Sequence, residues 1–395
     1  MSNFFYPLLE NPYRKKDIRS AIKVLNSKKL TIGPVTERFE KRFRDKIKVN
    51  GSLMVNSGSS ANLLALQCLI NPHRKYRLSH GDEVLIPSLC WSTSLWPIVQ
   101  SGLKPKFVDV DISTLNIDLK DLKKKITKKT KAILIVHVLG YCTNMSDLIR
   151  IKNKHNLILI EDTCESLGTK YKDKYLGTYG EFSTFSFYSS HQISSGEGGM
   201  VCCKSTEDYE ILKSLRSHGW SRGLRDEKKI ANKNKHLDKR FIFFNSGFNL
   251  RPTDITASIG LSQFNDLDQF IKTRSINRKN IIKEINKREI GKLFKIIKED
   301  SNIKPSWFGL PIILSSKINK NKFVKKIEAN GIETRPIISG NFLRQPSINK
   351  YKLNKKIKLI NSDYINNNGL FIGLPTRIIS KKIITKLVDI FEKSI

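Results

Sequence analysis

The sequence predicts an α/β protein with a large, doubly wound domain around a mainly parallel sheet, followed by a smaller α+β domain. Apolar segments rich in β-branched residues alternate with helix-length segments over the first two-thirds of the chain, which is typical of parallel sheets. The 395 residues are 39% hydrophobic, which suffices for a sizeable core. The pattern changes after about residue 265. We therefore expect a large domain with an N-terminal arm at 1–265 and a small C-terminal domain at 266–395.

Near-continuous apolar runs indicate strands that are buried on both faces. In the first domain these runs lie at 84–88, 105–110, 131–140 and 156–163, and helices are expected at 60–70 and 145–155. In the second domain, amphipathic patterns predict helices within 281–290, 325–332 and 381–393, and strands at 306–314 and 333–337. Ligands of such a sheet bind at the carboxyl ends of its strands.

The formal net charge of +35 arises from 71 Lys+Arg against 36 Asp+Glu, a balance that also occurs in nucleic-acid-binding proteins. The lysines are spread over many expected helices, which favours a lysine-rich proteome as the explanation. The sequence shows no secretory signal and no run of 18 apolar residues, so no membrane segment is expected. Six cysteines without a CxxC pair indicate a reducing, cytoplasmic setting and predict no metal site.

The first motif that indicates chemistry is VNSGSSANLLAL at 55–66, where small residues open a helix after a short strand. Free backbone N–H groups and the positive end of the helix dipole make such a start an anion site. The small residues are Ser57, Gly58, Ser59 and Ser60, and the serine hydroxyls can add hydrogen bonds to a phosphate. An ordinary serine-capped helix explains the same residues.

The second motif is NLILIEDTCES, in which an apolar strand ends in Glu161 and Asp162. An acid at this edge can pair with a protonated ring nitrogen and keep the ring electron-poor, as an electron-sink cofactor requires. Many α/β enzymes use an acid at this position for metals or for capping, so the motif alone leaves these alternatives open.

The third motif is TFSFYSSHQISSGEGGMV at 184–201, which places His191 in a Ser/Gly-rich loop between two expected strands. A lone histidine is more often structural than catalytic, but this loop favours a position facing a cleft. With an unperturbed pKa near ~6.5, histidine suits proton transfer at neutral pH.

In this order, the three motifs closely resemble those of the DegT/DnrJ/EryC1/StrS sugar aminotransferase family. The resemblance extends from LTIGPVTERFE through WSTS, EDTCES and GFNLRP into the closing domain. It implies fold type I of the pyridoxal phosphate enzymes, the aspartate aminotransferase-like fold. It also implies a homodimer in which the two subunits share their active sites.

The sequence departs from the family pattern at His191, the position at which the aminotransferases carry the lysine that bonds covalently to the cofactor. No lysine lies between Lys174 and Lys204, and imidazole cannot form the stable imine that a lysine amine forms. This departure resembles the 3-dehydratases of deoxysugar biosynthesis. It implies that pyridoxal phosphate or pyridoxamine phosphate is bound without a covalent bond.

One branch of these dehydratases carries an iron–sulfur cluster, which needs about four closely placed cysteine thiolates. This chain has no cysteine after Cys203. Its pieces DVDISTLNID, SHGWSR, SWFG and RPIISGNF are similar to the cluster-free branch, which serves colitose and lipopolysaccharide O-antigen synthesis. The resemblance implies loss of the C3 hydroxyl from a nucleotide-linked 4-keto-6-deoxy sugar, GDP-4-keto-6-deoxy-D-mannose, with L-glutamate as amino donor.

The resemblance also implies a role for each candidate residue. His191 is the catalytic acid and base. The residues that would hold the cofactor are Gly58, Ser59 and Ser186 at the phosphate, Trp91 stacked on the ring, Asp162 at the ring nitrogen and Glu165 near the ring hydroxyl.

Three further residues would act in the site of the neighbouring subunit. Asn249 would reach the cofactor phosphate there, while His218, as a second catalytic residue, and Arg222 would lie near the sugar or its phosphates. Arg335 would meet an anionic ligand. A structural turn explains the His-Gly-Trp run equally well, and a surface arginine explains Arg335.

Two other functions stay open at this level. The first is a sugar 4-aminotransferase that works without the lysine, and the second is a non-catalytic, basic nucleic-acid-binding paralogue. The lysine-rich segment 225–241 lacks a pattern and is expected to be a loop.

Overall fold

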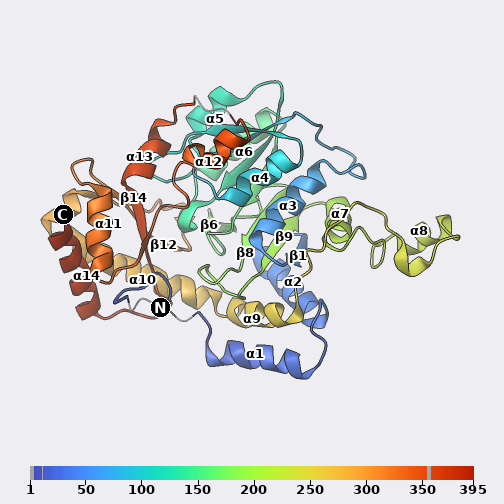
Figure 1. Cartoon of the computed structure of the whole chain (residues 1–395), viewed down its shortest axis with the longest axis horizontal. Helices are drawn as coiled ribbons and strands as arrows, with labels where there is room; N and C mark the ends of the chain where they lie inside the picture. Colours follow the sequence, from blue (N-terminus) through green and yellow to red (C-terminus); the bar gives the residue numbers. More distant parts are fainter. Residues whose placement is uncertain (1–3, 11, 354–356) are drawn as a thin grey trace.

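The computed structural model describes residues 4–10, 12–353 and 357–395. Its large sheet has the strand order β1-β9-β8-β5-β4-β2-β3 (Figure 1). The strands are β1 (Gly51–Val55), β2 (Glu83–Pro87), β3 (Lys104–Val108), β4 (Thr130–Val136), β5 (Ile158–Asp162), β8 (Phe182–Ser186) and β9 (Gly199–Cys203). Every pairing is parallel except those of β9, which runs antiparallel to both neighbours. The predicted mainly parallel sheet is therefore confirmed.

Helices cover both faces of this sheet, so the fold is doubly wound. They are α2 (Pro34–Ile47), α3 (Gly58–Leu69), α4 (Ser92–Gln100), α5 (Leu119–Lys125), α6 (Met145–Lys154), α7 (Thr206–Arg216) and α9 (Asp254–Phe264). Helix α1 (Lys15–Asn26) packs on α9 instead. Because side chains alternate along a strand, Met54 and Met200 pack into the aromatic cluster under α2 and α9, whereas Leu53 and Val201 pack on the opposite face.

The C-terminal part is built on a second, antiparallel sheet with the order β10-β12-β14-β13. Its strands are β10 (Phe294–Lys295), β12 (Gly309–Leu314), β13 (Thr334–Arg335) and β14 (Gly369–Gly373). Its helices are α10 (Leu267–Asn286), α11 (Lys320–Ala329), α12 (Pro346–Lys350), α13 (Ile360–Asn368) and α14 (Lys381–Ser394). We keep the division into 1–265 and 266–395 as a proposal, since it falls between α9 and α10.

The helix predicted within 281–290 is misplaced at its end. Helix α10 ends at Asn286, and a 3-10 turn at Glu289–Lys292 follows it. The apolar pattern of the sequence continues past the helix because Ile290 is buried in this separate turn.

A small third sheet contains β6 (Lys170–Tyr171), β7 (Lys174–Tyr175) and β11 (Ile303–Lys304).

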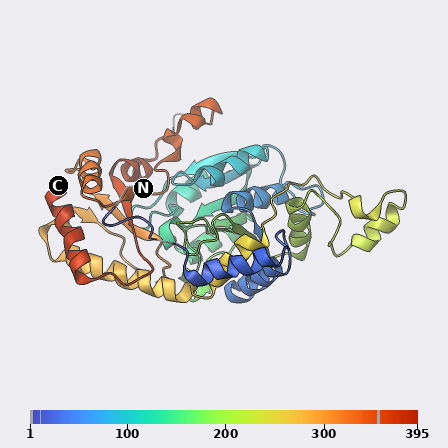
Figure 2. The same ribbon diagram turned by 60° about the horizontal axis from the view of Figure 1, so that its bottom comes forward.

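The basic segment that follows α7 projects away from the rest of the molecule in both views (Figures 1 and 2). The expectation of an unpatterned loop at 225–241 is wrong in part, because Glu227–Lys233 forms helix α8 and Lys239–Phe241 a 3-10 turn. Two aromatic residues at the C-terminal end of this segment, Phe241 and Phe243, are each 58% exposed.

Among the described helices, none combines the length and the apolar character that crossing a membrane requires.

Candidate active site

A cavity of about 570 Å³ lies where the carboxyl ends of the parallel strands meet the small domain. Eight of the predicted site residues line it: Gly58, Ser59, Trp91, Asp162, Glu165, Ser186, His191 and Arg335. The small domain closes the opposite side with Phe308 and Phe371. None of the described residues that line the cavity is a lysine.

The start of α3 forms one wall of the cavity and offers an anion site. The Ser57 hydroxyl caps the helix by accepting a hydrogen bond from the Ser60 N–H at 3.1 Å. Ser59 and Thr93 share a hydrogen bond of 2.8 Å between their hydroxyls. The first N–H groups of a helix have no intrahelical acceptor, so this start can receive a phosphate.

Gly58 permits the close approach of this helix to strand β8. A Cβ built at Gly58 would lie 2.6 Å from the Cβ of Ser186 and 3.0 Å from the Sγ of Cys164. The absence of a side chain thus brings the helix start and the Ser186 hydroxyl to one point. Any larger residue would have to push the helix away from the strand.

Asp162 presents a buried carboxylate to the cavity from the end of β5. It is 4% exposed, and its Oδ2 accepts hydrogen bonds from the Ser94 hydroxyl at 2.7 Å and the Asn62 amide at 2.9 Å. No lysine, arginine or histidine in the described part of the chain forms an ion pair with it. A buried carboxylate held by neutral donors suits a cationic group that arrives with a ligand.

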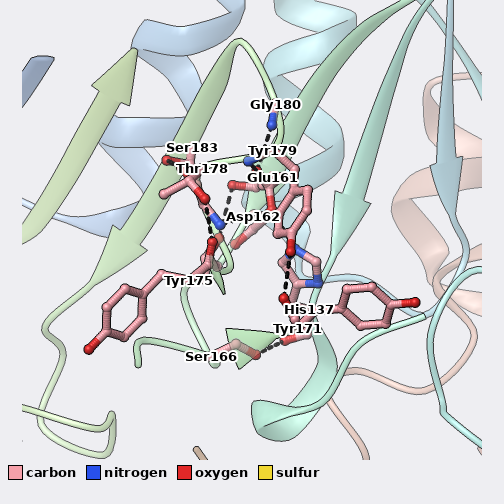
Figure 3. A network of polar contacts seen from close by, with 12 residues as sticks. His137, Glu161, Asp162, Ser166, Tyr171, Tyr175, Thr178, Tyr179, Gly180 and Ser183 are labelled. Atoms are coloured by element: carbon pink, nitrogen blue, oxygen red, sulfur yellow. Dashed lines mark hydrogen bonds and ion pairs between the residues drawn. The ribbon is translucent and has the colours of Figure 1, made fainter. Parts of the chain in front are cut away.

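Glu161, the preceding residue, points to the other side of the sheet and is fully buried. It accepts hydrogen bonds from His137 Nε2 at 3.1 Å and from the backbone N–H groups of Gly177, Tyr179 and Gly180 at 2.7–2.8 Å (Figure 3). Burial raises its pKa, but these donors outweigh burial and hold the pKa below the ordinary value. The network fixes the end of β5 against the turn that leads into β8.

Glu165 lies in the turn after β5 and lines the cavity. Burial raises its pKa to about 7, and the neighbouring Asp162 charge acts in the same direction. The Leu139 N–H, which donates to Oε2 at 2.9 Å, opposes the shift. At neutral pH this carboxyl is therefore poised between its charged and neutral forms.

His191 lies in the β8–β9 connection, as the sequence predicts. Its ring packs edge-on against Phe308 and Tyr188, with ring centroids 5.2 and 6.1 Å apart. Burial lowers its pKa to about 4; the Tyr188 carbonyl opposes this, and the Arg274 charge adds to it. The imidazole is thus neutral at pH 7 and can accept a proton.

Trp91 and Arg335 lie at the rim of the cavity. Trp91 is 57% exposed, which is unusual for so large an apolar side chain and leaves its face free to stack on a ligand ring. Arg335 donates to the Glu333 carboxylate at 2.7 Å and to the Thr334 carbonyl at 2.8 Å. These two hydrogen bonds use two of the five N–H donors of the guanidinium, so donors remain for an anion.

Three predicted site residues lie away from this cavity, near the base of the projecting segment. Asn249 is exposed and accepts a hydrogen bond from Arg251 Nε at 3.0 Å, and Arg222 is exposed as well. The His218 ring packs on Trp220 at 4.9 Å between centroids. A single chain does not bring these residues to its own cavity.

Sequence reasoning missed Asn62 and Ser94, which hold Asp162 in place. Asn62 lies inside a predicted helix, where a buried amide among apolar neighbours is the available signal. It also missed the His137–Glu161 pair, for which two polar residues in apolar strands are the signal.

The DegT/DnrJ/EryC1/StrS aminotransferase family model matches residues 12–389. The chain belongs to this family. It is 36% identical over 373 residues to the GDP-4-keto-6-deoxy-D-mannose 3-dehydratase of Escherichia coli O55:H7, covering 93% of this chain and 95% of that protein.

Two similar solved structures have the same fold. The E. coli GDP-4-keto-6-deoxy-D-mannose-3-dehydratase with bound hydrated PLP has a TM-score of 0.90 at 34% identity and covers 98% of this chain and 99% of its own. A structure of GDP-4-keto-6-deoxymannose-3-dehydratase with a trapped PLP-glutamate geminal diamine also has a TM-score of 0.90, at 33% identity, over 98% of this chain and 100% of its own. The predicted fold type I architecture is thereby confirmed.

We expect Gly58→Ala to weaken binding of pyridoxal phosphate at least about tenfold, equivalent to ~1.4 kcal/mol, because the added Cβ separates the helix start from Ser186. Titration of the cofactor absorbance with the purified protein measures this. Gln67→Ala, at the far end of the same helix, is the control and should bind normally. Equal affinity of both variants would contradict the phosphate site at α3.

Proposed function

We propose that the chain is a vitamin-B6-dependent nucleotide-sugar 3-dehydratase that removes the C3 hydroxyl of GDP-4-keto-6-deoxy-D-mannose. The observation that carries the proposal is the neutral histidine at the family's lysine position, in a cavity whose described lining contains no lysine. Similarity to GDP-4-keto-6-deoxy-D-mannose 3-dehydratases over nearly the whole chain supports it.

The residues of the cavity fit a phosphorylated pyridine cofactor that is held without a covalent bond. The start of α3 and the Ser186 hydroxyl would bind its phosphate, Asp162 its protonated ring nitrogen, and Trp91 the face of its ring. When bound in its amine form, the cofactor supplies the nitrogen that condenses with the C4 ketone and an electron sink for loss of the C3 oxygen.

His191 would move the protons of the reaction. As a neutral imidazole it can take a proton from the C4′ carbon of the bound cofactor, and in its protonated form it can donate to the departing C3 oxygen. Its low pKa makes the protonated form a strong acid, which favours this donation. Glu165, with a pKa of about 7, would share a proton with the ring hydroxyl of the cofactor.

L-glutamate is the proposed amino donor, and Arg335 the residue that meets an anionic group of glutamate or of the sugar nucleotide. The similar structure with a PLP-glutamate adduct supports the donor. The position of Arg335 on the small-domain side of the cavity supports its role. Lysine is absent from the described lining, so covalent capture of the cofactor would not compete with dehydration.

We further propose a homodimer with shared sites, in which Asn249 reaches the partner's cofactor phosphate and His218 and Arg222 approach its sugar nucleotide. Support comes from their position, because none of the three lines the cavity of its own chain: Arg222 and Asn249 are exposed, and His218 is half-buried.

The six cysteines are free thiols, which suits the cytoplasmic location that we propose.

The test of the function is a product assay with the purified chain, pyridoxal phosphate, L-glutamate and GDP-4-keto-6-deoxymannose, in the absence of any reductase. We expect a sugar product that has lost the C3 oxygen, together with 2-oxoglutarate and ammonia, as read by mass spectrometry. Nitrogen retained at C4 would instead establish an aminotransferase. Salt-sensitive DNA binding without any turnover would favour the basic nucleic-acid-binding alternative.

We expect His191→Lys to lose dehydration by at least about a hundredfold, the lower range of a general acid–base contribution. The introduced lysine should bond covalently to the cofactor, so that borohydride reduction fixes the cofactor to the chain. His191→Asn is the matched control, with equal loss of dehydration and no covalent cofactor. Dehydration at the wild-type rate in either variant would remove His191 from the reaction.

Shared sites predict that two inactive variants complement each other. Dimers co-expressed from His191→Asn and Asn249→Asp chains should recover roughly a quarter of wild-type activity, because half of the dimers are mixed and each mixed dimer has one intact site. Separate expression of each variant provides the background. Mixed dimers that stay inactive would show that each chain completes its own site.

A further inference from the structure

Arg274 is a buried arginine next to the β8–β9 connection that carries His191, here called the catalytic loop. Its charge has no acidic partner in the described residues. It lies on α10, is 4% exposed, and donates only to backbone carbonyls: Nε to Leu374 at 3.1 Å and Nη2 to His191 at 3.3 Å. It also borders a small cavity beneath the loop. Burial lowers its pKa to about 10, so the guanidinium stays charged at neutral pH.

Arg278, one helical turn further along α10, shows what a purely structural arginine looks like in the same helix. It is equally buried, but its guanidinium pairs with Glu299 at 2.8 Å and stacks over Trp307 at 4.0 Å. Burying a charge without a counter-ion is expensive, and such groups cluster at functional sites. The contrast indicates that the uncompensated charge of Arg274 has a use.

The surroundings of His191 show where that charge acts. The Nδ1 atom of His191 is buried and forms no hydrogen bond with a side chain among the described residues, and the Tyr188 carbonyl is the backbone group that favours the protonated ring. The charged or titratable groups that border the loop from other elements or from the loop itself are Glu10, Tyr13, Arg14, Asp162, Cys164, Glu165, Tyr188, Glu197, Arg274 and Arg335.

Burial is the largest cause of the low His191 pKa, and of these groups Arg274 is the one whose charge adds to it by disfavouring the protonated form. The acids Glu165 and Asp162 line the same cavity, and neither forms a hydrogen bond with the ring among the contacts of the described residues. A carboxylate at Nδ1 would do the opposite of Arg274, because it would stabilise the imidazolium.

We propose that Arg274 is a positioning residue that fixes the backbone of His191 and, through its unpaired charge, keeps the imidazole neutral until it takes a proton from the substrate complex. The inference rests on the proposed dehydratase function of the same site. A proton on His191 is then held weakly, which suits its delivery to the departing hydroxyl oxygen. Because Arg274 also donates to Leu374 at the end of β14, it ties the small domain to the catalytic loop.

The experiment is an NMR titration of the full-length, histidine-labelled protein without cofactor, in which His191→Asn identifies the signal among seven histidines. We expect the wild-type signal not to titrate between about pH 5 and 8, the window in which an ordinary histidine changes charge. In Arg274→Gln the midpoint should rise by about one pH unit, within the spread that surroundings impose on histidine.

Two variants serve as controls. Arg274→Lys keeps the charge and one donor and should titrate as the wild type does, while Arg278→Gln removes a paired arginine and should leave His191 unchanged. Arg274→Met, a second charge-free variant, replaces Arg274→Gln should that variant fail to fold. The titration extends below pH 4 to reach the wild-type midpoint, and a His191 midpoint that stays at the wild-type value in a folded, charge-free variant overturns the proposal.

The acid limb of kcat/KM for dehydration gives a second measurement. It should move to higher pH in Arg274→Gln and stay in place in Arg274→Lys and Arg278→Gln. Since the titration needs neither substrate nor cofactor, a failed product assay with a shifted His191 midpoint would refute the dehydratase while keeping the role of Arg274. A normal product assay in which the His191 midpoint is the same in Arg274→Gln and the wild type would support the dehydratase and refute the role of Arg274.

Discussion

The site depends on the last two residues of β5, which carry adjacent carboxylates to opposite sides of one sheet. A strand cannot turn both side chains the same way, so Glu161 enters the protein interior and Asp162 enters the cavity. Four donors surround Glu161 and offset the cost of its burial. Together with the pairing of β5 to β4 and β8, and with the donors Asn62 and Ser94, this network sets the point at which Asp162 enters the cavity.

The cavity exists only where the two sheets meet. The large sheet contributes the helix start at α3, Asp162 and Ser186, whereas the small domain contributes Phe308 and Arg335. His191 lies between these contributions, with its ring against Phe308 and its backbone carbonyl bonded to Arg274 of α10. A change in the angle between the two sheets would therefore move His191 and the Phe308 and Arg335 side of the cavity together.

Much of this arrangement follows from sequence patterns because it rests on local physics. Strands β2, β3, β4 and β5 are largely apolar runs whose carboxyl ends emerge at one edge, so the position of Asp162 was predictable, whereas His191 was indicated by its Ser/Gly-rich loop. The end of α10 was not predictable, because the buried Ile290 in the following turn continues the apolar pattern of the helix. The helix at Glu227–Lys233 was not predictable either, because it buries no residue and so shows no apolar pattern. The burial of Arg274 was not predicted, because an arginine in an amphipathic helix usually faces water and only tertiary packing shows that this one does not.

The connection that carries His191 starts and ends at fixed points, because Ser186 of β8 pairs with Gly199 of β9 and the two strands hold their register without help from the loop. Hydrogen bonds between Phe187 and Gly198 and between Ser195 and Phe187 close its base. The frame of this loop is therefore set by the two strands and does not depend on the side chain at position 191. Under the proposed function, a change of reaction type on this scaffold would require a different side chain at that position and no new fold.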